Sequence, residues 1–138
     1  EEAAQDFAEA LRIDPKHAIK HYALAMKSEE DERWRHAIMQ YSIAMQLDPE
    51  EPHFYVVRAL DYNELGEHDR AIADCAEAIR LDPNVAGPYI SQALAYYGKG
   101  KRDAAIAARQ EADRQRDNAR AARRSQARRP GASASSRP

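Results

Sequence analysis

One short motif, an aliphatic residue followed by Asp and Pro, recurs at a fixed interval and strongly limits how this chain can fold. It reads Ile13-Asp14-Pro15, Leu47-Asp48-Pro49 and Leu81-Asp82-Pro83, which places successive aspartates 34 residues apart. Proline cannot continue a helix, so each motif marks the end of one. A period of this length indicates a repeat architecture in which one small helical unit stacks on the next.

The chain divides into blocks of this length, and each full block contains two helical segments separated by a turn. The full blocks are residues 18–51, 52–85 and 86–119, and residues 1–17 correspond to the second helix of a truncated block. We expect helices at residues 18–30 and 34–47, at 52–64 and 68–81, and at 86–97 and from 101 onward. Glycines occupy the second and third turns, where a residue with positive φ commonly follows a helix end.

Small and large apolar residues recur at matching positions of the blocks. Ala37, Ala71 and Ala105 share one position, and a second small residue follows seven positions later in each block. Alanines at fixed positions let helices approach closely, and a larger side chain such as Tyr41 or Cys75 fills the gap beside them. One such unit cannot bury its apolar face alone, so stacked neighbours must supply the core.

The second block resembles the tetratricopeptide repeat, whose 34-residue pattern is W-x2-L-G-x2-Y…A-x3-F…P. At these seven positions the block has Tyr55, Arg58, Ala59, Tyr62, Ala71, Cys75 and Pro83, and the other blocks match in phase over roughly residues 1–117. The resemblance implies an all-α fold, a right-handed superhelical solenoid of stacked antiparallel helix pairs. It also implies a protein–protein interaction scaffold that binds a peptide or helix of a partner.

In this family the first helices of the pairs line a concave surface that holds the partner. The positions that face this groove form an apolar stripe with a polar rim: Ile19, Tyr22, Met26, Val56, Leu60, Asn63, Ile90, Leu94 and Tyr97. Large apolar side chains in one exposed stripe usually mark an interaction site. The alternative is that these side chains pack within the repeats or against the chain's own tail.

One class of partner is disfavoured by the residues in the groove. Family members that bind the C-terminal carboxylate of heat-shock chaperones use Lys, Arg and Asn side chains on these helices. The corresponding residues here are Tyr22, Met26, Val57, Gly87 and Ser91, and none is a cation or an asparagine. The resemblance therefore does not extend to chaperone-tail binding.

The C-terminal part differs from the rest of the chain in charge. Residues 1–100 contain 19 acidic and 10 basic side chains, whereas residues 101–138 contain 11 basic and four acidic ones. Arg109 and Asp113 replace apolar residues that would meet a further repeat, so we expect the last helix to present a solvated, capping face. Residues 120–138 form a basic, low-complexity tail that we expect to be disordered.

This basic tail supports a different hypothesis for function. Its arginines could contact phosphates of nucleic acid or an anionic surface, but no aromatic side chains are interleaved for base stacking. A third hypothesis is that the chain is a non-catalytic repeat segment of a larger enzyme.

Residues that carry chemistry are sparse. The chain lacks the common nucleotide-binding, zinc-protease and hydrolase motifs, so we expect no catalysis, no cofactor and no metal. His17 and His21 have the spacing of two metal ligands on one helix face, but no third ligand is placed beside them. Cys75 occupies the aromatic position of the repeat, which predicts a buried, inert thiol. The acidic run from Glu29 to Glu32 is expected to be a solvated turn.

The location of the protein is inferred from what the sequence lacks. No apolar run approaches the roughly 20 residues that span a bilayer, and the N-terminal residues do not resemble a signal peptide. Cys75 is the single cysteine, so an intramolecular disulfide cannot form. These features favour the cytoplasm.

Overall fold

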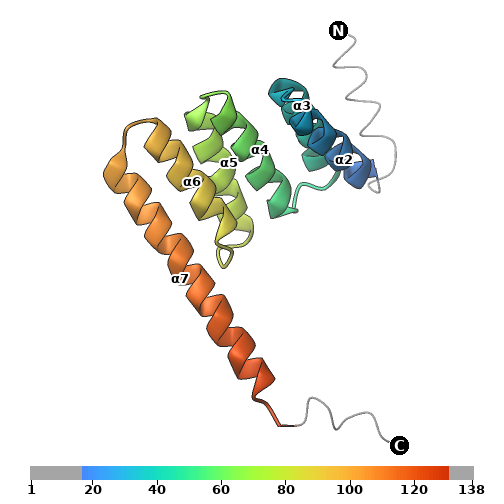
Figure 1. Ribbon diagram of the computed structural model, residues 1–138. Coiled ribbons are helices and arrows are strands. Elements are labelled where there is room, and N and C mark those ends of the chain that lie inside the picture. The colour runs from blue at the N-terminus through green and yellow to red at the C-terminus, as the bar shows by residue number, and fades with distance from the viewer. Residues whose placement is uncertain (1–16, 131–138) are drawn as a thin grey trace, which may run out of the picture.

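A computed structural model describes residues 17–130, and within them every regular element is a helix. The helices are α2 (His17–Glu30), α3 (Trp34–Leu47), α4 (Pro52–Glu64), α5 (His68–Leu81), α6 (Gly87–Gly98) and α7 (Arg102–Ala127). They form three consecutive pairs, α2–α3, α4–α5 and α6–α7, which follow one another through the molecule (Figure 1). The predicted helices are confirmed, with starts and ends that differ by a single residue at most before the end of α7.

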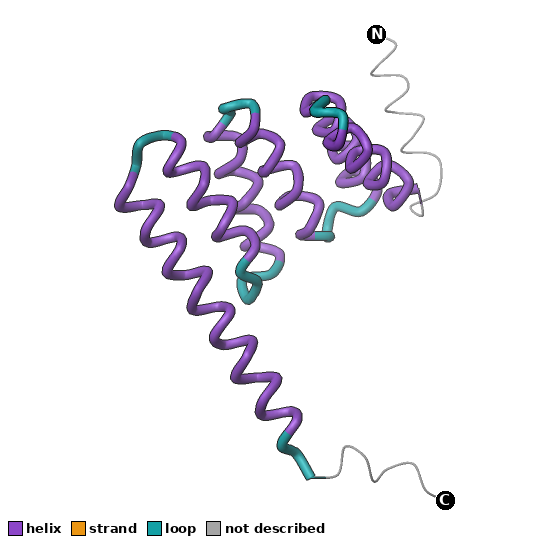
Figure 2. Tube along the Cα trace, viewed as in Figure 1, coloured by secondary structure: helices purple, strands orange, loops and turns teal. Residues whose placement is uncertain are grey.

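The turn inside each pair has the same hydrogen bonds. The backbone N–H groups of Arg33, Glu67 and Lys101 each donate to the carbonyl group five residues earlier, at 2.8, 2.9 and 2.9 Å. This is the bond that closes a helix end when the preceding residue adopts a left-handed conformation. Gly66 and Gly100 occupy that position with φ of 76° and 75°, whereas the first turn places Glu32 there with φ of 55°. Short loops, residues 48–51 and 82–86, join successive pairs (Figure 2).

The core is built from the alanines that the period selected. Ala37, Ala71 and Ala105 are buried, as are Ala44, Ala78 and Ala112. Tyr41 and Cys75 are fully buried between them, in the two positions where the repeat pattern places an aromatic residue. Small residues at the helix contacts, with one larger side chain in each of the first two pairs, therefore give a closely packed interior.

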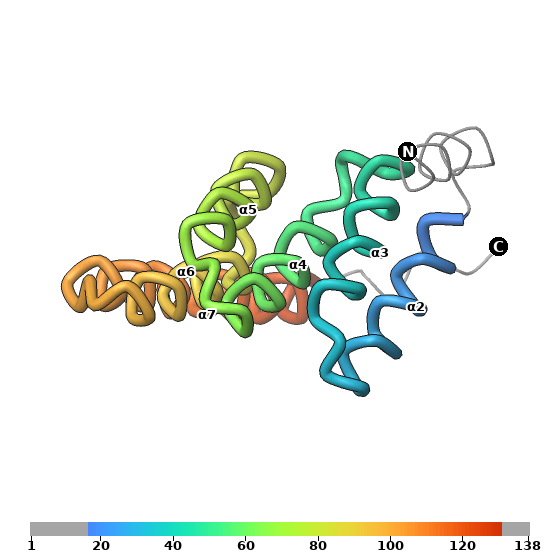
Figure 3. Tube along the Cα trace, turned by 90° about the horizontal axis from the view of Figure 1, so that it is seen from above, coloured from blue at the N-terminus to red at the C-terminus, as the bar shows by residue number. Residues whose placement is uncertain are grey.

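Successive pairs stack through their neighbouring helices. Helix α4 packs on α3, and α6 packs on both α5 and α4. The joints repeat as well, because the Tyr55 hydroxyl donates to the Pro49 carbonyl and the Tyr89 hydroxyl donates to the Pro83 carbonyl, both at 3.3 Å. Seen from above, the helix axes turn between the pair α2–α3 and the pair α6–α7, as expected for a superhelix (Figure 3). The predicted all-α solenoid is confirmed.

Helix α7 extends further than the repeat period predicts. It continues to Ala127 and projects beyond the other helices, so residues 120–127, which the sequence led us to expect as disordered, are helical (Figure 1). The segment has no proline before Pro130, and it consists largely of alanine, arginine and glutamine, which favour a helix. Ion pairs one turn apart, such as Arg114–Glu111 and Arg116–Asp113, support it further. The expected helix at residues 1–16 and the end of the tail, residues 131–138, lie outside the described residues.

Candidate functional site

Three exposed residues of the predicted groove occupy equivalent positions and form a row across the first helices of the pairs. Met26 on α2, Leu60 on α4 and Leu94 on α6 are 34 residues apart, and they expose 45%, 38% and 51% of their surface. Ile19 and Tyr97 are also exposed, at 74% and 69%. Large apolar side chains rarely remain this accessible in a row without a role in binding.

Four other residues of the predicted groove are half-buried, and two of them, Tyr22 and Asn63, hold helices together. The Tyr22 ring lies 5.7 to 5.8 Å from the rings of Phe54 and Tyr41, and its hydroxyl lies 3.0 Å from His53 Nε2. Asn63 Nδ2 donates to the Ser91 carbonyl at 3.2 Å and so links α4 to α6.

The other two half-buried residues line hollows. Val56 faces Gly87 of α6, and Ile90 lines a hollow on the far side of α6. The predicted stripe therefore contains both exposed contact residues and residues that join the repeats.

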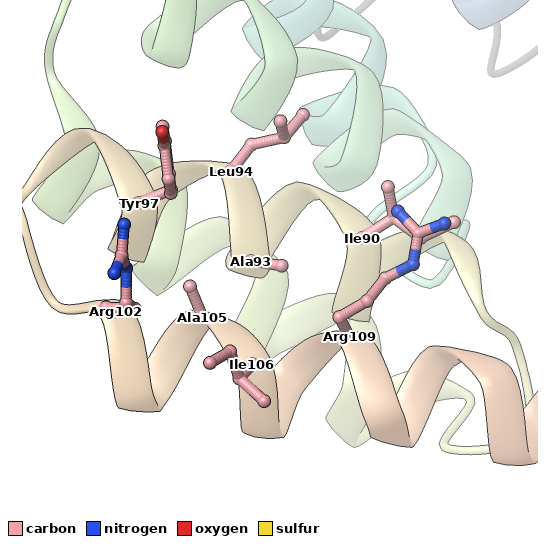
Figure 4. A pocket seen from close by; sticks show the side chains of 8 residues that line it. All are labelled: Ile90, Ala93, Leu94, Tyr97, Arg102, Ala105, Ile106 and Arg109. Carbon is pink, nitrogen blue, oxygen red and sulfur yellow. The ribbon is translucent and has the colours of Figure 1, made fainter.

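An open apolar hollow of about 480 Å³ lies between α6 and α7 (Figure 4). Arg102 and Arg109 lie at its two ends, beside Tyr97 and Ile90, and apolar side chains form its floor (Figure 4). Its lining is Ile90, Ala93, Leu94, Tyr97, Arg102, Ala105, Ile106 and Arg109. The last helix was predicted to present a charged face at the end of the array. That face is charged only in part, because half-exposed Ile106 lies on it beside the exposed Arg109.

A smaller hollow of about 280 Å³ lies where α4 and α6 begin. His53, Val56 and Gly87, which occupy groove-facing positions of their repeats, contribute to its wall, and Val85 beside them is exposed. The surface of the first helices is thus indented at this point, next to the row formed by Met26, Leu60 and Leu94.

A polar cluster lies between the first two pairs. Asp61 on α4 is only 2% exposed, its Oδ2 atom has no hydrogen-bond partner among the described residues, and its neighbours include Glu29. Burial and the nearby carboxylate of Glu29 raise the pKa of Asp61 to about 9, so the side chain is protonated at neutral pH. The Tyr41 hydroxyl donates to Glu29 at 2.7 Å, and burial followed by this bond raises the pKa of Tyr41.

Glu29 was expected in a solvated turn, but it is half-buried near the end of α2. The period alone gave no sign of this contact, because no other repeat has a carboxylate at either position. The residues equivalent to Glu29 are Asn63 and Tyr97, and the residue equivalent to Asp61 is Ala95.

A second polar contact missed by sequence reasoning joins α4 to α5. The Arg58 guanidinium donates to both carboxylate oxygens of Asp74, at 2.6 and 2.8 Å, and to the Ser42 hydroxyl of α3 at 3.0 Å. Asp74 is buried, and this two-point geometry is the strong form of an ion pair. The contact stabilises the middle of the array, and its side chains are only 21% (Arg58) and 8% (Asp74) exposed.

The residues considered for chemistry serve the scaffold. His21 Nδ1 lies 2.7 Å from Gln40 Oε1, so this ring joins α2 to α3. Cys75 is buried as expected, and burial raises the pKa of its thiol to about 12. Among residues 17–130, no group of three or more His, Cys, Asp or Glu side chains is arranged to hold a metal ion. None of the described helices is long and apolar enough to cross a membrane.

Two of the five positions compared with a chaperone-tail clamp lie outside the groove. Val57 packs against the cluster of Ala25, Ala37 and Tyr41, and Ser91 is buried against the second pair. That chaperone tails are disfavoured as partners therefore stays a prediction.

Comparisons with known proteins agree with this geometry. The sequence profile named Tetratricopeptide repeat matches residues 52–85, the second pair of helices. A search of curated proteins found no match.

Among solved structures, MamA superposes with a TM-score of 0.70 at 27% identity, over 83% of this chain and 67% of that one. The first repeat domain of Spaghetti (RPAP3), bound to the HSP90 peptide SRMEEVD, gives 0.71 at 23% identity, over 77% and 84%. The type III secretion translocator chaperone SycD of Yersinia enterocolitica gives 0.71 at 18% identity, over 75% and 78%.

Two independent features thus lead to one assignment. The 34-residue period places alanines, turn glycines and the Tyr–Pro joints at equivalent points of successive helix pairs, and the pairs superpose on solved repeat domains. The second pair of helices matches the tetratricopeptide-repeat model, and the chain has the fold of solved tetratricopeptide-repeat domains.

Proposed function

We propose that the protein is a protein–protein interaction module that binds a peptide or helix of a partner along the first helices of its pairs. The observation that supports this most is the row of Met26, Leu60 and Leu94, which are exposed at equivalent positions of three stacked pairs. Helices α2, α4 and α6 are fixed by their packing, so little conformational entropy is lost when a partner binds.

The chemistry of the row defines what it accepts. Exposed apolar side chains with an indentation beside them suit an amphipathic helix or an extended apolar peptide, with adaptable Met26 at one end. Three anchors at roughly 1.5–3 kcal/mol each, less the cost of association, correspond to an affinity of about micromolar.

Related structures support a binding role and leave the partner open. The Spaghetti (RPAP3) domains were solved with an HSP90 peptide, and they share 21–23% identity with this chain. Of the five residues compared with a chaperone-tail clamp, none is a cation or an asparagine, so chaperone tails are disfavoured as partners in our proposal. The module has no catalytic role in this proposal, and we place it in the cytoplasm.

A second candidate function rests on the exposed arginines of α7. Arg114, Arg116, Arg120, Arg123 and Arg124 all lie on the projecting part of the helix. Association with nucleic acid through them would be lost on deletion of residues 114–138, and it would weaken steeply with salt. Retention of such binding by the truncated chain would exclude this candidate.

The groove is tested by capture of partners from the source cells with the 138-residue chain and two variants. Leu60→Glu places a charge in the row, whereas Met39→Glu does the same at a similarly exposed residue of α3, a second helix. We expect proteins captured by the wild type to remain with Met39→Glu and to be absent with Leu60→Glu. Thermal unfolding should be the same for both variants, and loss of the fold in Leu60→Glu would mean that this residue belongs to the core.

A further inference from the structure

The hollow between α6 and α7 repeats a surface that is covered elsewhere in the same molecule. Each of its eight lining residues lies 34 positions after a residue of the second pair. Ile90, Ala93, Leu94 and Tyr97 correspond to Val56, Ala59, Leu60 and Asn63, and the α7 residues correspond to His68, Ala71, Ile72 and Cys75. The second pair uses this surface to receive α6.

The contacts of α6 show how a helix fits there. Its Ala95 packs into one cluster with Ala59, Ala71 and Cys75, and Ile72 packs against that cluster. Asn63 bonds the Ser91 backbone, and Gly98 lies so close to the His68 ring that a Cβ atom there would meet it at 2.4 Å. Val56, Asn63 and His68 thus face named residues of α6. Four more of the eight equivalent residues belong to the cluster that contains Ala95 or pack against it: Ala59, Ala71, Ile72 and Cys75.

The third pair presents the same surface without a helix on it. Ala59 and Cys75 are fully buried, whereas their equivalents are half-buried Ala93 and exposed Arg109. Ile106, the equivalent of Ile72, is 50% exposed. The hollow therefore has the shape and apolar floor of a helix-docking position.

Two residues change the chemistry of this position. Arg102 replaces His68, which faces Gly98 of the docked helix, and Arg109 replaces Cys75, which lies against Ser91. Arg116 and Arg123 continue the series, so arginines recur every seven residues along α7 and all are exposed. Seven residues are nearly two full turns, so these side chains share one face of the helix with a slow drift.

Charge makes α2 of a second copy a poor match for this position. At the positions equivalent to Pro88 and Ala95 of α6, α2 has the exposed Lys20 and Lys27. At the positions equivalent to Ser91 and Gly98 it has Ala23 and Glu30, so it offers a single acidic residue for the two arginines. The segment after α7 is also basic. An acidic helix of another protein has the complementary charge.

We propose that the end of the array is a second docking site, which takes an amphipathic helix of a partner with acidic residues seven positions apart. The helix lies parallel to α6, with apolar or small side chains on Ile90, Leu94 and Ile106. Its acidic residues occupy the places equivalent to Ser91 and Gly98 and pair with Arg109 and Arg102. This site is distinct from the row of Met26, Leu60 and Leu94, although Leu94 borders both.

The chain supplies its own probe. A blocked, fluorescent peptide of residues 86–99 with Ser91→Glu and Gly98→Glu is titrated with the 138-residue protein, beside the same peptide with Ser91→Lys and Gly98→Lys. The acidic peptide gains two ion pairs with Arg102 and Arg109, whereas the lysine peptide meets two repulsions. The acidic peptide should therefore bind about tenfold more tightly than the lysine peptide. The double variant Arg102→Glu, Arg109→Glu should reverse this preference.

Matched variants separate the site from the groove and from general charge. Ile106→Glu should weaken both peptides, whereas Leu60→Glu in the groove and Arg114→Glu off the arginine row should leave binding unchanged. Equal binding of the two peptides, or no binding up to about 1 mM, would overturn the proposal. Self-association that Ile106→Glu abolishes would also overturn it, because the hollow would then belong to a second copy. Displacement of the acidic peptide from Arg102 and Arg109 by a DNA duplex would overturn it as well.

Discussion

Replacing Asp61 by asparagine should stabilise the protein at neutral pH. Asp61 is buried between the first two pairs and faces Glu29, and its pKa of about 9 means that the folded state keeps it protonated while the unfolded state ionises it. Folding therefore takes up a proton at neutral pH. Asparagine has nearly the same size, carries no charge and can still donate a hydrogen bond to Glu29.

The size of the effect follows from the two pKa values. A group whose folded pKa is raised contributes stability that is complete below its unfolded pKa of 3.8 and declines as pH rises towards the folded value. Each pH unit in this window changes the free energy of unfolding by about 1.4 kcal/mol. At pH 7 the asparagine variant should be more stable by roughly 4 kcal/mol, and between pH 7 and pH 5 this advantage should shrink by about 3 kcal/mol.

Urea unfolding followed by circular dichroism at pH 5 and pH 7 measures both quantities. Asp31→Asn is the matched control, because Asp31 is exposed in the first turn, and its effect should stay within about 0.5 kcal/mol at both pH values. An Asp61→Asn variant that is less stable at pH 7, or whose advantage is the same at both pH values, would refute the reasoning.

Two substitutions and one labelling experiment test the scaffold further. Glu32→Gly should raise the free energy of unfolding by about 1 kcal/mol, because Glu32 has positive φ where the other turns have glycine; an unchanged urea midpoint would contradict this. Arg58→Leu should cost about 3 kcal/mol by leaving buried Asp74 without its partner, and adding Asp74→Ala should recover most of that loss in a double-mutant cycle. Cys75, with its pKa raised to about 12, should react with a thiol reagent at pH 8 only as the protein unfolds, and rapid labelling of the folded chain would show that it is accessible.

The period of the sequence was sufficient to predict the scaffold. Ala71, Cys75 and Pro83 were assigned to the core and the joint from their spacing alone, because stacked repeats place equivalent residues in equivalent surroundings. Turn glycines fixed the helix ends equally well. The end of α7 was missed because low apolar content was interpreted as disorder, although alanine and arginine favour a helix.

The binding surfaces were harder to predict from one repeat at a time. Tyr22 and Asn63 occupy groove-facing positions, yet they hold α2 to α4 and α4 to α6. Whether such a residue faces a partner or the next repeat depends on the side chain opposite it, which spacing does not reveal. The hollow at the end of the array was missed for the same reason, since it needs residues from both helices of one pair.

Departures from the period therefore identify what is particular to this chain. Where Ala95 meets the second pair, the equivalent Asp61 meets the first, so the two internal contacts differ in their response to pH. At the open end Arg109 stands in the place of Cys75, and its partner within α7 is Asp113, at 3.7 Å. A docked helix with a neutral residue there would bring no closer carboxylate to this cation at the edge of an apolar contact. A fourth pair of the same kind would thus be accepted poorly, whereas a helix that brings a carboxylate would gain the ion pair. A surface inherited from the stacking of repeats becomes selective for a partner through two arginines.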